Sequence, residues 1–281
     1  MDLNLILVCV VIVVALFFSY TNGFHDAANA IATSVSTRAW TPRAALLMAA
    51  TMNVIGAMMG TAVAKTVGKG IISISDYAES PLPEMQQKGL VIILAALLGA
   101  CIWNLITWWF GLPSSSSHAL IGGMVGAGLL SGTMVHWWGI MSHVVIPMFA
   151  SPIVGFVIGY FVMKLVLWLL RNAQYHRTMR RFRAAQRFSS AAMALGHGIQ
   201  DAQKTMGIIV MALLAGGYGE THNILDPITG EMNVPLWVKI SGALAISLGT
   251  MAGGGRIMRT IGRKIIDLDP ARGFTAEAVS A

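Results

Sequence analysis

Apolar runs of membrane-spanning length constrain this chain more than any other feature of its sequence. They cover residues 3–36, 44–64, 89–111, 115–135, 141–170, 189–216 and 236–255. The hydrocarbon core of a bilayer is about 30 Å thick and an α-helix rises about 1.5 Å per residue, so one span needs roughly 20 apolar residues. Only 11% of the residues are charged, whereas soluble domains carry about 25%. The sequence therefore predicts an all-α polytopic membrane protein and excludes an ordinary soluble enzyme.

Two of these runs contain polar insertions. Residues 3–36 and 189–216 are too long for a simple perpendicular span, and they carry the polar segments 23–29 and 196–204. Transporters often hold such segments at the bilayer midplane by unwinding the helix there. We therefore expect a broken helix at each insertion.

The distribution of arginine predicts how the chain is oriented. Segment 171–187 holds six arginines and no acidic residue, so the positive-inside rule places it in the cytoplasm. Loop 217–235 holds three acidic residues and no Lys or Arg, and it should lie outside. The net charge of +7 arises from short stretches between apolar runs, which favours membrane topology and argues against nucleic-acid binding. We expect a multi-pass protein of the inner or plasma membrane of the cell.

An internal repeat connects the two halves of the chain. The segment 23–27, Gly-x-x-Asp-Ala, recurs at 198–202 with an offset of 175, and residues 65–72 resemble 259–266 with an offset of 194. The predicted orientation makes the first copy begin outside and the second begin inside, so we expect the inverted repeats of a secondary transporter. The predicted units are a first repeat at 1–170, a basic cytoplasmic linker at 171–188 and a second repeat at 189–281.

A serine-rich tip divides the stretch 89–135 into two apolar arms. The tip, 113–118, reads Pro-Ser-Ser-Ser-Ser-His. The predicted orientation requires an even number of crossings here, which two full spans and one re-entrant hairpin both satisfy. We include a re-entrant-type hairpin in the predicted fold. An offset of 194 would place a second tip near position 307, beyond Ala281, so we expect an incomplete second repeat and a C-terminally truncated chain.

Asp26 and Asp201 are the polar residues that most need an explanation. A carboxylate at the centre of a membrane helix costs about 2.5–3.5 kcal/mol even on lenient insertion scales. This cost requires water, a bound cation, or internal pairing with Lys204 or a histidine. Asn29 and Gln203 place amide oxygens close to the two carboxylates in sequence. Such oxygens suit a hard cation such as Na⁺, and carboxylates also suit a proton relay.

The serine-rich tip offers a site for an anion. Ser114–Ser117 lie where a helix is expected to begin before His118, and a helix N-terminus with hydroxyl donors suits a tetrahedral oxyanion. An ordinary polar turn with an N-cap is the alternative. A bound anion and the carboxylates would repel each other, and a cation between them resolves the repulsion, which is the basis of symport. We interpret His25, His118 and His197 as packing or supporting residues rather than as ligands of a structural metal.

Three segments together resemble the signatures of the inorganic phosphate transporter (PiT) family. In that family, each of two repeats carries a Gly-x-Asn-Asp-x-x-Asn-like motif and a Pro-x-Ser-Thr-Thr-His-like hairpin tip. Segments 23–29 and 198–204 are similar to the first motif, and 113–118 is similar to the tip. The resemblance implies a secondary transporter, without a cofactor and often homodimeric, that imports inorganic phosphate with Na⁺ or H⁺ by alternating access.

The resemblance also implies roles for individual residues. Those implied to bind phosphate are Ser115, Ser116 and Ser117. Those implied to serve the coupling cation and the substrate are Asp26, Asn29, Gln200, Asp201, Gln203 and Lys204, with Na⁺ possible at Asp26, Asn29 and Asp201. His25 and Gln200 stand where the family motif has Asn before each Asp, a departure that could alter the choice of cation.

The sequence leaves three alternatives open. A sulfate transporter of the same fold is the first, although the aspartates favour phosphate because phosphate can donate a hydrogen bond to a carboxylate and sulfate cannot. The second is an inactive fragment or a sensor. The third is an intramembrane hydrolase with a serine of 114–117 as nucleophile and His118 or His197 as base, which leaves the duplicated Asp motifs unexplained. We therefore predict a transporter and not an enzyme.

Overall fold

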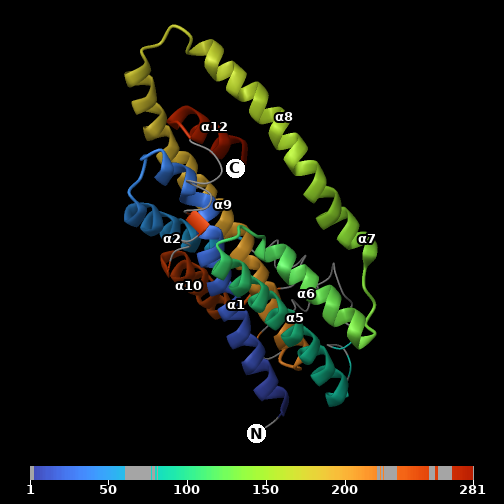
Figure 1. Ribbon diagram of the computed structural model, residues 1–281. Helices are drawn as coiled ribbons and strands as arrows, with labels where there is room; N and C mark the ends of the chain where they lie inside the picture. Colours follow the sequence, from blue (N-terminus) through green and yellow to red (C-terminus); the bar gives the residue numbers. More distant parts are fainter. Residues whose placement is uncertain are drawn as a thin grey trace.

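Helices make up the architecture of the described part of the chain (Figure 1). The computed structural model describes residues 3–60, 77, 80, 82–219, 222, 224, 233–252, 257–258 and 268–280. The elements are α1 (Leu3–Ser36), α2 (Pro42–Met58), α5 (Pro83–Phe110), α6 (Ser116–Ser131), α7 (Trp137–Ile140), the π-helix η1 (Met141–Val145), α8 (Ile146–Leu169), α9 (Tyr175–Ala215), α10 (Leu236–Ala252) and α12 (Pro270–Ser280). The predicted all-α class is confirmed.

Three of the described helical stretches are long and apolar enough to cross a membrane. They are Leu3–Ser36, Pro83–Phe110 and Trp137–Leu169. The last runs through α7, η1 and α8, of which α8 contacts α12, along one side of the molecule in Figure 1. Its apolar side chains are largely exposed, as expected of a surface that contacts lipid rather than water. The protein is therefore a membrane protein.

The expected breaks in the first and sixth apolar runs are wrong. α1 is one helix of 34 residues and α9 is one helix of 41 residues, which gives lengths of about 50 and 60 Å. Neither contains proline. Their polar side chains find partners across helices, as when His25 Nε2 lies 2.9 Å from Thr107 Oγ1 on α5. Several polar side chains thus find partners on neighbouring helices while the backbone stays helical.

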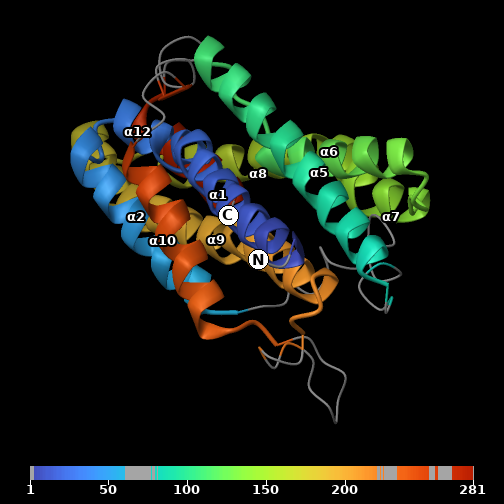
Figure 2. The same cartoon turned by 90° about the horizontal axis from the view of Figure 1, so that it is seen from below.

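The motif glycines serve instead as points of close helix contact. α1 packs along α10, and α9 packs along α2, as Figure 2 shows. A methyl group at Gly23 would overlap the backbone of α10 at Ile246, and one at Gly198 would overlap the backbone of α2 at Asn53. Between α2 and α10, Asn53 Nδ2 donates to Thr250 Oγ1 at 2.8 Å. The four helices therefore form one tightly packed group.

α5 and α6 form a helical hairpin that packs against α1 and α9. Gly111 ends α5 in the left-handed region, with φ of 66°, and this turn lets Pro113 and the serines lead into α6. α6 has 16 residues and is about 24 Å long, shorter than the hydrocarbon core. Fully buried apolar side chains join this hairpin to the helix group, including Phe18, Leu97, Ile209 and Ile246.

The sequence also predicts repeated segments and a basic linker, which the structure describes to different extents. The repeated segments 65–72 and 259–266 lie outside the described residues, so the structure does not bear on their equivalence. The segment 171–188, predicted as a linker, is helical from Tyr175 onward because it forms the first turns of α9. Its arginines are exposed along that helix.

The close contact between α9 and α2 predicts a sharp difference between two neighbouring glycines. Gly198→Ala would push a methyl group into the α2 backbone, and we expect it to destabilise the fold by about 1–3 kcal/mol, the usual cost of overpacking. Gly196→Ala is the matched control, because its added methyl would meet nothing within 4 Å. Thermal unfolding in detergent measures both. Equal melting temperatures for the two variants would contradict the assigned contact.

Candidate functional site

A cavity of about 540 Å³ lies where α1, the hairpin tip, α9 and the end of α12 meet. Polar side chains from all four segments face it. Its lining residues are Asp26, Ala30, Pro113, Ser114, Ser115, Ser117, Ala192, Met193, Gly196, His197, Gln200, Asp201, Lys204 and Ser280. Segments far apart in sequence thus contribute to one polar site, as the motifs predicted.

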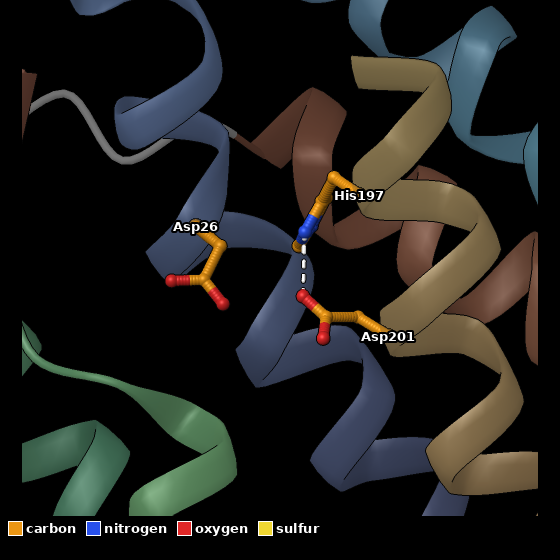
Figure 3. A group of neighbouring side chains, drawn as sticks. All are labelled: Asp26, His197 and Asp201. Carbon is orange, nitrogen blue, oxygen red and sulfur yellow. Dashed lines mark ion pairs between the residues drawn. The ribbon is translucent and has the colours of Figure 1, made fainter. Parts of the chain in front are cut away.

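Two carboxylates and one imidazole form the centre of this site (Figure 3). Asp26 projects from α1 toward the pair His197 and Asp201 on α9. His197 Nδ1 lies 2.5 Å from Asp201 Oδ2, and one ligand atom from each of the three residues lies within 4.8 Å of the others. The side chains of His197 and Asp201 are only 13% and 10% exposed. This arrangement can hold a cation or share a proton between its members.

Lys204 connects this centre to the hairpin tip. Its Nζ donates to Asp201 Oδ1 and to Ser117 Oγ. The internal pairing of Asp201 with Lys204 or a histidine, considered from the sequence, is therefore present, and it involves both partners at once. Asp201 and Lys204 are three residues apart on α9, which places them on the same face of the helix.

The serines of the tip do not all face the same way. Ser115 caps α6 by accepting from the backbone N–H of His118 at 3.3 Å, and Ser114, Ser115 and Ser117 line the cavity. Ser116 is fully buried, and it is not among the described lining residues. The N-terminus of α6 with three hydroxyls can bind an oxyanion.

A hydrogen-bonded chain positions the tip, and no sequence motif indicates it. Ser114 Oγ donates to Thr107 Oγ1 at 3.2 Å, and Thr107 Oγ1 lies 2.9 Å from His25 Nε2. Thr107 was not predicted as a site residue. A lone threonine in an apolar helix usually bonds its own backbone, as Thr107 also does with Trp103. His25 has the supporting position expected for it.

The remaining predicted residues differ in their placement. Gln200 lines the cavity. Gln203 is buried and is not among the described lining residues. The side chain of Asn29 lies outside the described part of the structure.

A buried glutamate on α12 contacts α1 and α9, and no sequence motif indicates it. Glu277 on α12 is 1% exposed and accepts hydrogen bonds from Thr33 Oγ1 at 2.5 Å, from Gln186 Nε2 at 3.2 Å and from Ser189 Oγ. α12 reaches the cavity through Ser280. Its short polar sequence resembles an exposed helix, so nothing in the sequence pattern indicated burial.

The environment of Glu277 predicts how the docking of α12 depends on pH. Burial raises the pKa of the Glu277 carboxyl, and the hydrogen bonds from Ser189, Thr33 and Gln186 oppose that shift. A carboxyl whose pKa is raised by folding stabilises the fold below its usual pKa and loses that contribution as pH rises through the raised value. We expect the melting temperature to fall as pH rises, and Glu277→Gln to reduce this dependence. The matched control is Glu84→Gln at an exposed position of α5, and equal pH profiles for both variants would contradict the assignment.

Comparison with known proteins identifies the family. Residues 22–281 match the model of the phosphate transporter family. A Bacillus subtilis protein named "Probable low-affinity inorganic phosphate transporter" is 41% identical over 283 residues, covering 100% of this chain and 79% of that protein. A Streptomyces halstedii protein of the same name is 57% identical over 198 residues, covering 70% of this chain and 89% of that protein. A solved structure called "The sodium-dependent phosphate transporter" shares the fold, with a TM-score of 0.79 at 24% identity over 97% of this chain and 83% of that chain. The chain belongs to the phosphate transporter family.

Proposed function

We propose that this protein imports inorganic phosphate together with a coupling cation, H⁺ or Na⁺, by alternating access. The observation that carries the proposal is the single cavity in which a serine-lined helix N-terminus faces two carboxylates on different helices. The names of the relatives support phosphate as the substrate. The name of the solved relative supports a cation as the coupled ion. Because the chain belongs to a transporter family, we set aside the alternative of an intramembrane hydrolase.

The electrostatics of the cavity explain why anion and cation would bind together. Phosphate at the tip would be held by Ser114, Ser115 and Ser117, by the α6 dipole and by Lys204. It would then lie close to the carboxylates of Asp26 and Asp201, which repel it in a site of low dielectric. A proton or Na⁺ bound between them offsets that repulsion. Each ligand therefore raises the affinity for the other, and this reciprocity couples their transport.

The packing of the helices supports the proposal of inverted repeats. The two motif glycines make equivalent contacts, Gly23 of α1 with α10 and Gly198 of α9 with α2. Each repeat would thus contribute one helix to each close pair. The shortness of α6 favours the re-entrant hairpin over two full spans. We further propose that segment 171–187 faces the cytoplasm, that the protein lies in the cell membrane, and that it acts as a homodimer.

Uptake of radiolabelled phosphate into proteoliposomes containing the 281-residue chain tests the function directly. We expect an imposed Na⁺ or H⁺ gradient, each applied separately, to drive uptake. Asp26→Asn and Asp201→Asn should each abolish it, because the first removes a carboxylate available to the coupling cation and the second removes the buried carboxylate that pairs with His197 and Lys204. The matched control is Asp269→Asn, since Asp269 caps α12 through Arg272 N at 2.8 Å and asparagine caps equally well. Normal uptake by both aspartate variants would rule out the mechanism, and competition by sulfate alone would point to a sulfate transporter.

The unequal placement of the serines predicts unequal effects on phosphate affinity. Ser117→Ala removes a hydroxyl that lines the cavity and contacts Lys204, and we expect the KM for phosphate to rise by about tenfold or more, the usual effect of a lost hydrogen bond to a charged group. Ser116→Ala should leave the KM within about twofold, because its Oγ has no partner among the described residues and its removal costs little. Initial uptake rates at varied phosphate concentration measure both. A larger effect at Ser116 than at Ser117 would contradict the geometry.

A further inference from the structure

Lys204 introduces a fixed positive charge into the cavity. Among the described residues that line the cavity, it is the one Lys or Arg. Its side chain is only 18% exposed, and its partner Asp201 is 10% exposed. A buried carboxylate must have a countercharge, because leaving it unpaired is strongly destabilising. The ammonium of Lys204 supplies that countercharge from the same helix.

Both oxygens of the Asp201 carboxylate already have a partner from the protein. Oδ1 accepts from Lys204 Nζ, and Oδ2 lies 2.5 Å from His197 Nδ1. A mobile cation that ligated Asp201 would have to displace one of them. It would also lie close to the Lys204 ammonium, and the two like charges would repel each other at low dielectric. The geometry at Asp201 therefore disfavours an exchangeable cation.

The two motifs differ in the residue that lies three positions after the aspartate. Three residues after Asp26 the first motif has Asn29, and three residues after Asp201 the second motif has Lys204. An amide oxygen is a neutral ligand that leaves room for a cation, whereas an ammonium is itself a cation and has donors only. The second motif thus carries one more positive charge than the first at the equivalent position.

We propose that Lys204 is a tethered cation, which takes the place of an exchangeable coupling cation at Asp201 and contacts the bound phosphate together with Ser117. The proposal rests on the phosphate transport proposed above. An ammonium has three N–H donors, and Asp201 and Ser117 take two of them, so the third can reach an oxyanion at the tip. The protein then needs one exchangeable cation fewer per phosphate than a site with a neutral residue at position 204.

Chemical rescue of a variant that lacks the ammonium tests this assignment. Binding of radiolabelled inorganic phosphate is measured on the purified chain in nanodiscs, in a buffer whose cation is bulky N-methyl-D-glucamine. We expect Lys204→Ala to raise the Kd by about tenfold or more, and added methylammonium or Na⁺ to restore most of the loss. Methylammonium should leave the wild-type Kd unchanged, and Lys204→Arg should retain most of the affinity. The matched control is Lys164→Ala, at an exposed lysine of α8.

Thermal unfolding without phosphate separates this proposal from the proposed function. Methylammonium or Na⁺ should raise the melting temperature of Lys204→Ala more than that of the double variant Asp201→Asn/Lys204→Ala, in which position 201 no longer carries a carboxylate; Asp26 is present in both. A wild-type chain that binds no phosphate would defeat the proposed function, whereas this melting test would still decide the role of Lys204.

Two results would overturn the proposal for Lys204. One is a phosphate affinity of Lys204→Ala equal to that of the wild type, and the other is a loss of affinity that neither cation restores. Should Lys204→Ala not fold, recovery of folded protein in the double variant supports it, and a double variant equally unable to fold overturns it.

Discussion

The buried carboxylate of Asp201 is the constraint on which the arrangement of the site depends. A charge held 10% exposed within a helical bundle is tolerated only with partners in place. His197 and Lys204 lie on the same helix as Asp201, so α9 can satisfy the charge wherever that helix is placed. Lys204 also holds Ser117, and Asp26 approaches from α1. Lys204 thus ties the hairpin tip to the buried carboxylate on α9, and Asp26 of α1 lines the same cavity.

The glycines in the two motifs make this approach possible. Gly23 and Gly198 allow α1 and α9 to touch the backbones of α10 and α2, and each precedes its aspartate by three residues, less than one helical turn. The aspartates are therefore held on backbone that close packing keeps rigid. An unwound segment would have placed the same carboxylates on mobile backbone, and the uninterrupted helices show that close packing, rather than unwinding, positions them.

The sequence predicts which segments share the cavity better than it predicts how the backbone holds them. The apolar runs predicted the helical membrane fold, and the duplicated motifs and serine tip predicted residues that share the cavity. The continuity of α1 and α9 was missed because a polar segment looks the same whether its side chains bond across helices or its backbone unwinds. Ser116 could not be distinguished from Ser117, since orientation at a helix start depends on the turn at Gly111. Glu277 was missed because burial of α12 arises from contacts with α1 and α9 that no local pattern records.

The hydrogen-bonded chain behind the tip gives the proposed coupling a physical route. Ser114 is bonded to Thr107, and Thr107 to His25, which is the residue before Asp26 in α1. A shift of the tip on binding an anion would therefore act on the same turn of α1 that carries the carboxylate. On the other side, Lys204 ties Ser117 to Asp201. The proposed anion site is thus linked by hydrogen bonds to Asp201 and to the turn of α1 that carries Asp26. A movement that closes around phosphate would therefore change the geometry available to the proposed cation.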